Sequence, residues 1–181
     1  MRGQSIEWNR IIEFDLGYLR KLETKHIHAG YINGLNDPEI NSFLEVRKQK
    51  QSSRLIEEFI RQNNSSKASV LLGIWSRTSK NHIGTIRIHD ISLVNAHCYL
   101  GICIFDKAFH GLGYGNKSLI ALHEYLSNTC NGMTIEAHVH QNNIASQRLF
   151  RKSGYTSAGI IYKKFPGDAI EAGYYVYRVK P

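Results

Sequence analysis

A glycine-rich segment near the middle of the sequence has the residue types needed to bind an anion. It reads His110-Gly111-Leu112-Gly113-Tyr114-Gly115-Asn116. An almost continuously apolar stretch, 96–105, precedes it, and leucines at 119, 122 and 126 follow it at helical spacing. Glycine lets the backbone approach a ligand closely, and the start of a helix presents unpaired N–H groups with partial positive charge. The segment therefore predicts a strand-to-helix turn that binds phosphate oxygens.

Two known phosphate-binding motifs fit this segment poorly. The dinucleotide fingerprint requires G-x-G-x-x-G, whereas this segment has G-x-G-x-G and no acidic residue about 20 positions later at the end of a strand. In the P-loop a lysine follows the last glycine directly, but here Asn116 separates Gly115 from Lys117. The remaining alternative is that the glycines only form a tight turn.

A second segment follows the next expected strand and favours a third interpretation. It runs Asn143-x-x-Ser146-x-x-Leu149-x-x-Lys152-x-Gly154-Tyr155. Together, the two segments resemble the GNAT superfamily of acetyl-CoA-dependent N-acetyltransferases, whose pyrophosphate loop is [QR]-x-x-G-x-[GA]. The patterns at 18–22 and 36–41 resemble the RimJ/RimL-like branch, and the resemblance covers residues from about 14 to 160. One departure is His110 in place of Gln or Arg; a neutral histidine lowers the phosphate affinity that we expect.

The resemblance implies an α/β (α+β) fold of the GNAT type. This fold has a mixed, mostly antiparallel central sheet with a splayed parallel pair of strands, flanked by helices. The parallel pair would be 96–105 and 133–140, with acetyl-CoA in the slot between them. By resemblance, the pantetheine arm pairs with the backbone near Ile104 and Phe105, the glycine loop binds the pyrophosphate, and Asn143 and Ser146 contact the cofactor arm. The resemblance implies acetyl-CoA as co-substrate and no metal.

Acetyl transfer to an amine needs a base, because only the neutral amine is nucleophilic. Glu136, His138 and His140 alternate along the strand expected at 133–140, so they share one of its faces. Two histidines and a glutamate are suited to relaying a proton. The alternative is that this face is solvated, or that the histidines bond to the backbone. A zinc site is not expected, because His-x-His with one carboxylate lacks a further ligand of recognisable spacing.

The departing thiolate needs a proton or a hydrogen bond. Many family members have a tyrosine after the leucine of the second motif, but this chain has Phe150, which has no proton to donate. Some RimL-like members use a serine at this motif position, so the resemblance implies that Ser146 assists the thiolate, with a packing or helix-start role as the alternative. Substrate contacts are expected from Glu45, Arg47 and the loop 162–168, although a solvated surface role for Arg47 is the alternative.

The elements that must position these residues follow from local patterns. Asp37-Pro38-Glu39 is a helix start, with aspartate at the N-cap and proline in the first turn. Thr24 is expected to cap a helix over 25–33, Ser53 to precede another, and Asn143 to open one that ends at Gly154. Strands are expected at 14–22, 70–75, 83–88, 96–105, 133–140, 155–162 and 170–179. The almost continuously apolar strand 96–105 is expected at the centre of the sheet, buried on both faces.

Length and composition favour one domain over residues 1–181 and exclude several classes of protein. Hydrophobic residues make up 42% of the 181 residues and charged residues 21%, an ordinary globular composition. The net charge of +8 favours an anionic partner, but the basic residues are scattered, which argues against nucleic acid. Three cysteines without zinc spacing, and no apolar leader or membrane span, predict a cytoplasmic protein.

These observations lead to one functional expectation. We expect an acyltransferase that moves acetyl from acetyl-CoA to a primary amine by direct attack, with a small, nucleotide-linked amino sugar as the favoured acceptor. The alternatives are a protein N-terminal acetyltransferase of the ribosomal-protein type and a non-catalytic basic module associated with nucleic acid or ribosomes. No membrane partner is expected, and a homodimer is compatible with the pattern.

Overall fold

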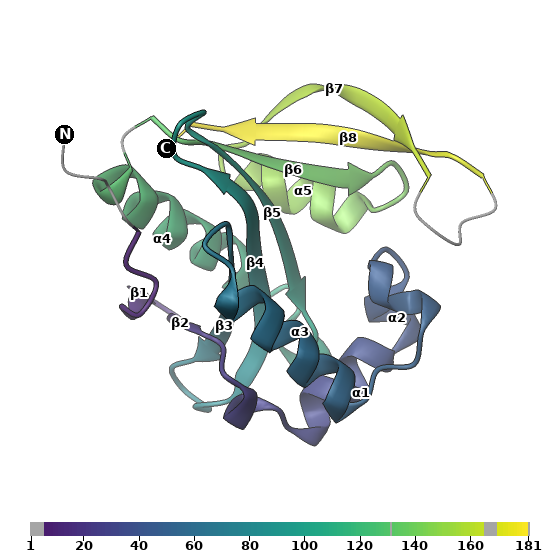
Figure 1. Cartoon of the computed structure of the whole chain (residues 1–181). Helices are drawn as coiled ribbons and strands as arrows, with labels where there is room; N and C mark the ends of the chain where they lie inside the picture. Colours follow the sequence, from purple (N-terminus) through teal and green to yellow (C-terminus); the bar gives the residue numbers. More distant parts are fainter. Residues whose placement is uncertain (1–5, 131, 165–169, 181) are drawn as a thin grey trace.

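The computed structural model describes residues 6–130, 132–164 and 170–180, and an eight-stranded sheet organises this part of the chain (Figure 1). The strand order is β1-β2-β3-β4-β5-β6-β8-β7. Every neighbouring pair is antiparallel except β5 and β6, which are parallel. The strands are β1 Ile12–Phe14, β2 Gly17–Lys21, β3 Ser69–Ser76, β4 His82–Ser92, β5 His97–Ile104, β6 Thr134–His140, β7 Thr156–Lys163 and β8 Ala172–Val179. This is the mixed GNAT fold that we expected from the sequence.

The helices begin where side chains can accept the unpaired N–H groups of the first turn. The α-helices are α1 Ala29–Asn36, α2 Pro38–Asn41, α3 Ser53–Ser65, α4 Tyr114–Thr129 and α5 Ile144–Lys152. The Asp37 carboxylate caps α2 and the Asn143 side chain caps α5, as their patterns predict. Ser52 caps α3, one residue before the expected start.

The predicted helix capped by Thr24 is wrong. Thr24–His26 forms only a 3-10 turn, η1, and α1 begins after His28, whose ring accepts a hydrogen bond from the Tyr31 N–H. Two further 3-10 turns are η2 at Glu45–Lys48 and η3 at Lys107–Phe109. The expected strand 14–22 is also divided, because β1 and β2 form a short hairpin. Gly17 is required there: a Cβ at this position would stand 1.9 Å from the Trp75 carbonyl oxygen.

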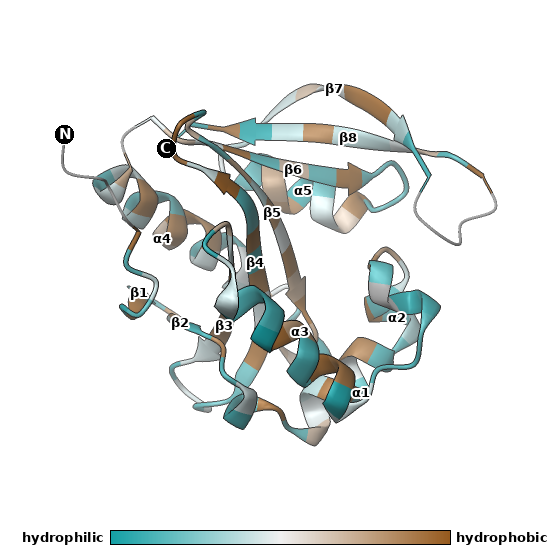
Figure 2. Cartoon of the chain, in the orientation of Figure 1, coloured by the Kyte–Doolittle hydropathy of each residue, from teal (hydrophilic) through white to brown (hydrophobic). Residues whose placement is uncertain are grey.

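Two hydrophobic clusters lie on opposite faces of the sheet. Leu119 and Leu122 of α4 and Phe150 of α5 belong to the larger cluster. Tyr31 of α1 and Ile60 of α3 belong to the smaller one. Figure 2 shows the hydrophilic outer side of α3 in teal, as expected for a helix that buries one face. Among the described helices, none has the length and apolar character needed to cross a membrane.

The parallel strands β5 and β6 separate after a short stretch of pairing. His97, Cys98 and Tyr99 pair with Thr134–Glu136, and beyond this register the two strands diverge (Figure 1). The prediction that 96–105 is buried on both faces is wrong, since His97 and Tyr99 are only partly buried. Cys98 and Leu100 are buried, but Gly101 is exposed and Ile102 is only partly buried, because no strand covers that edge.

Candidate active site

A cavity of about 410 Å³ lies at the point where β5 and β6 diverge. Strand β5 contributes Tyr99–Cys103, and β6 contributes alternate residues that include Glu136 and His138. Helix α5 supplies Asn143, Ser146 and Phe150 from one side. The remaining lining residues come from the N-terminal helical region, β3, β4, β7 and β8 and include Tyr31, Phe43, Glu45, Phe59, Arg87, His89, Lys163 and Tyr174.

Glu136 anchors the polar group at the base of this cavity. It is 5% exposed, and its carboxylate accepts hydrogen bonds from His138 Nε2 at 2.6 Å and from Arg178 Nε. His97 Nε2 lies 3.5 Å away. Burial acts to raise the pKa of Glu136, but the hydrogen bonds from Arg178 and His138 outweigh it and hold the pKa below its usual value. Glu136 is therefore an ionised anchor at neutral pH rather than a proton acceptor.

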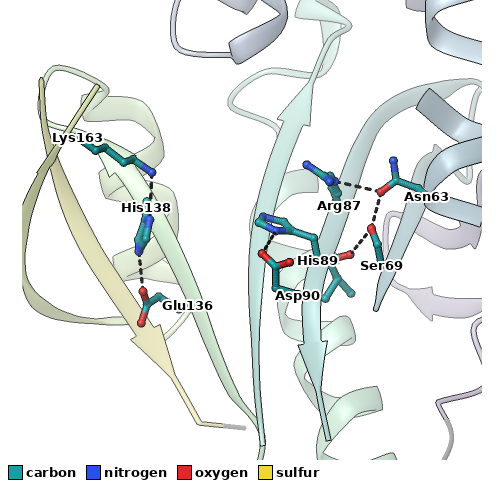
Figure 3. A network of polar contacts seen from close by, with 9 residues as sticks. Asn63, Ser69, Arg87, His89, Asp90, Glu136, His138 and Lys163 are labelled. Atoms are coloured by element: carbon teal, nitrogen blue, oxygen red, sulfur yellow. Dashed lines mark hydrogen bonds and ion pairs between the residues drawn. The ribbon is translucent and has the colours of Figure 1, made fainter. Parts of the chain in front are cut away.

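His138 is held in one orientation by its two neighbours. Because Nε2 donates to Glu136, Nδ1 carries the lone pair, and Lys163 Nζ lies 3.1 Å from it (Figure 3). Burial lowers the pKa of His138; the hydrogen bond to Glu136 acts in the opposite direction, and the Lys163 charge lowers it further. The half-buried imidazole is thus neutral near pH 7, with a basic nitrogen directed at an ammonium group.

Lys163 reaches the cavity from the end of β7. Its Nζ lies 4.6 Å from the centre of the Tyr174 ring on β8, in a cation–π contact. Burial lowers the pKa of this amine, while the charges of Glu45 and Glu136 oppose the shift. A larger fraction of Lys163 is therefore neutral at a given pH than for an exposed lysine.

The opposite wall of the cavity is also basic. Arg87 Nε donates to Asn63 Oδ1 at 3.1 Å, and its guanidinium lies 5.3 Å from the centre of the Phe59 ring. His89 stacks against the Tyr99 ring at 5.5 Å. Figure 3 shows Arg87 and His89 across the gap from His138 and Lys163. The lining thus brings cationic or basic groups to both sides of the space between the strands.

The start of α5 places a hydroxyl at the cavity. Asn143 Oδ1 accepts the N–H of Ser146 at 3.0 Å, which fixes the first turn and leaves the half-buried Ser146 in the lining. Phe150, one turn later, is 3% exposed and packs edge-on against Tyr155 at 4.9 Å. Phe150 therefore has a packing role, and Ser146 is the residue with an O–H group on this helix face.

The glycine loop connects the far end of β5 to α4. Gly111 and Gly113 have φ values of 73° and 89°, in the left-handed region that favours glycine. Gly113 is the N-cap of α4 and provides no side-chain hydrogen bond to the first turn. A Cβ on Gly111 would meet nothing within 4 Å. The N-cap thus supplies no side-chain acceptor to the first N–H groups of α4, an arrangement that fits phosphate oxygens.

Similarity to known proteins agrees with this geometry. The profile of the acetyltransferase (GNAT) domain matches residues 18–156. The chain belongs to the GNAT acetyltransferase family. It is therefore an acetyl-CoA-dependent N-acetyltransferase, with β5 and β6 as the splayed pair of the fold. None of the curated proteins matches the chain.

Solved structures share the fold of this acetyltransferase at low sequence identity. A GNAT-family acetyltransferase from Bacillus anthracis has a TM-score of 0.78 and 18% identity, over 94% of this chain and 98% of that one. RimL, a ribosomal L7/L12 alpha-N-protein acetyltransferase in complex with coenzyme A, has a TM-score of 0.76 and 18% identity, over 92% and 97%. Spermidine N-acetyltransferase from Vibrio cholerae, with CoA and spermine, has a TM-score of 0.73 and 20% identity, over 90% and 94%.

Ile104 and Phe105, the expected backbone partners of the cofactor arm, already make contacts within this GNAT chain. Phe105 is 3% exposed, and its N–H already donates to the Ile83 carbonyl at 3.0 Å. The Ile104 carbonyl accepts a hydrogen bond from His110 Nε2 at 2.8 Å. Neither Ile104 nor Phe105 is among the described lining residues, whereas Gly101–Cys103 are. The β5 residues nearest to Ile104 that line the cavity are therefore Gly101–Cys103.

The side chains of Tyr114 and Asn116 in the glycine loop form hydrogen bonds with other parts of the protein. Tyr114 is buried, and its hydroxyl hydrogen bonds with Ser76 Oγ at 2.8 Å. Asn116 Nδ2 donates to Ser153 Oγ at 3.0 Å, which ties α4 to the end of α5. Leu112 is 59% exposed. Tyr114 and Asn116 can thus offer a ligand only their backbone N–H groups.

The remaining predicted site residues are Glu45, Arg47, His140 and the loop 162–168. Glu45 lines the cavity, but Arg47 does not; its Nη1 donates to the Leu44 carbonyl at 2.9 Å. His140 lines the cavity with its ring against Phe43 at 5.2 Å, and its Nδ1 accepts the Asn142 N–H. His140 therefore bonds to the backbone, as one sequence alternative held, and does not continue the Glu136–His138 chain. Part of the expected loop 162–168 lies outside the described residues.

Sequence reasoning missed three polar residues of the site, Arg87, His89 and Arg178, and named Lys163 only as part of the loop 162–168. Arg87 and His89 lie two residues apart on β4, so strand alternation could have placed them on one face. Lys163 and Arg178 lie 25 and 42 residues from their partners His138 and Glu136. Within the described residues, no group of three or more His, Cys, Asp or Glu side chains is arranged to hold a metal ion.

Proposed function

We propose that this enzyme acetylates a small primary amine that carries a negative charge, by direct attack on acetyl-CoA with His138 as the base. The observation that carries the proposal is that His138 lines the cavity between the splayed strands with its Nε2–H held by Glu136, so that Nδ1, which Lys163 Nζ contacts at 3.1 Å, carries the lone pair. A neutral imidazole in this position accepts a proton from the substrate ammonium. The negative charge of Glu136 then stabilises the imidazolium that forms.

The residues around the glycine loop fit acetyl-CoA. The N–H groups of Gly111 through Asn116 and the start of α4 would hold the pyrophosphate, and the slot-facing backbone of Gly101–Cys103 would hold the pantetheine arm. His110 would act indirectly here, because its hydrogen bond to the Ile104 carbonyl fixes the loop against β5. Acetyl-CoA supplies an activated thioester carbonyl and a thiol leaving group.

Ser146 would assist the leaving thiolate. It is half-buried in the cavity lining, and the Asn143 side chain fixes its backbone. A hydroxyl can donate a hydrogen bond to the developing negative charge on sulfur, and Phe150 cannot. Backbone N–H groups on the open edge of β5 would stabilise the oxyanion, because preorganised dipoles act without further rearrangement.

The charge of the cavity supports an anionic acceptor. Arg87 and Lys163 bring two formal positive charges to the lining and Glu45 brings one negative charge, while the carboxylate of Glu136 is shared by Arg178 and His138, so that the set of Arg87, Lys163, Arg178, Glu45 and Glu136 is net positive. A polycation such as spermidine would be repelled by this set, whereas a phosphate or carboxylate next to the amine would be attracted. A nucleotide-linked amino sugar has this chemistry. The RimJ/RimL-like pattern in the sequence and the RimL neighbour make a protein amino terminus the competing acceptor.

A thiol-release assay with four acceptors tests the proposal: an amino-sugar phosphate, a nucleotide-linked amino sugar, spermidine and a peptide with a free amino terminus. We expect the two anionic amines to give the highest kcat/KM. Arg87→Gln should raise KM for them and leave a neutral sugar amine unaffected. Preference for spermidine, or an equal effect of Arg87→Gln on charged and neutral amines, would refute the anionic acceptor.

A further inference from the structure

Lys163 occupies the position that an acceptor amine needs. Its Nζ lies 3.1 Å from His138 Nδ1, within hydrogen-bond distance of the proposed base, and lines the same cavity as Ser146 and Gly101–Cys103 (Figure 3). A substrate ammonium would have to make this same contact before losing its proton. The enzyme thus carries a primary amine of its own at the place where an acceptor is expected.

We propose that, in the absence of an acceptor, the enzyme transfers an acetyl group to its own Lys163. This inference rests on the proposed function, because it uses the same base and the same co-substrate. The attacking amine belongs to the chain, so no second molecule has to bind. Tethering a reactant next to its reaction partner corresponds to a high effective concentration.

The surroundings of Lys163 favour its reaction over that of an ordinary lysine. Burial lowers the pKa of the amine, which increases its nucleophilic neutral fraction. The Tyr174 ring at 4.6 Å guides the alkyl stem across β8 towards the cavity. Lys164, the next residue, is exposed and offers a matched comparison.

The reaction balances without a further reactant. The Lys163 ammonium gives one proton to His138 Nδ1, and the free lone pair attacks the thioester carbonyl carbon, so that a C–N bond forms. The C–S bond then breaks and coenzyme A leaves as the thiolate, which takes the second proton of the attacking nitrogen. His138 releases the first proton to solvent. The products are Nε-acetyl-Lys163, coenzyme A as the thiol and one proton.

Acetylation would change the site itself. Nε-acetyl-lysine carries no charge, and its single amide N–H is a weaker donor than an ammonium group, so the cavity loses one positive charge. The modified enzyme should therefore bind anionic acceptors less tightly, and an acceptor should compete with the modification.

The experiment incubates the purified chain with acetyl-CoA alone and follows the intact mass and the acetylated peptides over time. We expect one acetyl group on Lys163, added at a rate that does not depend on protein concentration. Lys163→Arg should remove this modification and Lys164→Arg should not. At acetyl-CoA concentrations below the Kd, Gly113→Asp, which weakens binding at the cofactor loop, should slow it by about 5-fold or more, whereas spontaneous acetylation would not use that loop.

Five outcomes would overturn the inference. Equal labelling of Lys163 and Lys164, or unchanged labelling in Gly113→Asp, would show spontaneous chemistry in solution. A rate that rises with protein concentration would show transfer between molecules. If Lys163 stays unmodified while titration shows acetyl-CoA binding and an added amine is acetylated, self-acetylation fails and the proposed function stands. If acetyl-CoA does not bind at all, both fail.

Discussion

A negative charge at Gly113 should weaken acetyl-CoA binding without unfolding the protein. Gly113 is the N-cap of α4, with φ at 89°, and no side chain covers the helix start. In Gly113→Asp the carboxylate would stand among the N–H groups proposed to bind the pyrophosphate. Aspartate tolerates the left-handed region better than most residues, and its charge is favourable near a helix N-terminus. The nearest atom to a Cβ here is Leu16 Cδ1 at 3.7 Å, an ordinary contact.

The magnitude follows from Coulomb's law. Two unit charges about 4 Å apart repel by about 1 kcal/mol in water and about 4 kcal/mol at the effective dielectric of a protein surface. These values correspond to an increase in Kd of about 5-fold to about 1,000-fold, since about 1.4 kcal/mol is a factor of ten. The lower end applies if the phosphates stay fully solvated. The effect should shrink as salt is raised.

Calorimetric titration with acetyl-CoA measures this change, and Gly113→Asn is the matched control. Asparagine has nearly the same size and the same tolerance of positive φ, but no charge. We expect a much smaller loss in Gly113→Asn than in Gly113→Asp, with similar thermal midpoints for both. If both variants lose affinity equally, shape rather than charge governs the loop. If neither loses affinity, the loop does not bind the pyrophosphate.

Three further predictions concern catalysis and stability. Ser146→Ala should lower kcat about tenfold or more with little change in the Kd of acetyl-CoA, because one hydrogen bond to a charged group is lost; an unchanged kcat would exclude the thiolate role. The acid limb of the kcat/KM profile should lie below pH 6.5, since the pKa of His138 is lowered, and Lys163→Met should move it upward. Burial lowers the pKa of His82 to about 3, so unfolding free energy should fall by up to about 1.4 kcal/mol per pH unit as the pH drops from about 6.5 towards 3. In urea titrations at several pH values, His82→Phe should reduce the loss of unfolding free energy below pH 6.5. An unchanged dependence on pH would contradict the low pKa of His82.

The sequence predicts the start of a helix correctly where a single capping side chain determines it. The Asp37-Pro38-Glu39 and Asn143 starts are confirmed, because each capping oxygen lies within two or three residues of the N–H that it accepts. Thr24 failed because the histidine His28 caps α1 instead, and histidine is not a typical cap residue. The strand pattern at 96–105 predicted the element but not its exposure. Burial on both faces needs a neighbour along the whole strand, and β6 diverges after Tyr99.

The polar site depends on contacts that no local pattern contains. Strand alternation correctly grouped Glu136 and His138, which share a hydrogen bond at 2.6 Å. It could not separate the role of His140, whose Nδ1 bonds to a backbone N–H two residues later. Strand alternation also could not place Lys163 of β7 next to His138 of β6, because the strand order β6-β8-β7 is a property of the tertiary structure.

The position of Lys163 follows from this strand order and from side-chain length. His138 lies on β6 and Lys163 at the end of β7, with β8 between them, so the two backbones are two strand spacings, roughly 10 Å, apart across the sheet; they are also offset along it, because His138 pairs with Val176 and Lys163 with Ala172. A short side chain on β7 could not cover that distance, whereas the four-carbon stem of lysine crosses the Tyr174 ring and brings Nζ to 3.1 Å from Nδ1. Arginine would also reach but stays charged at any working pH. Lysine at this position therefore combines reach with an amine that can lose its proton, which is the property that self-acetylation requires.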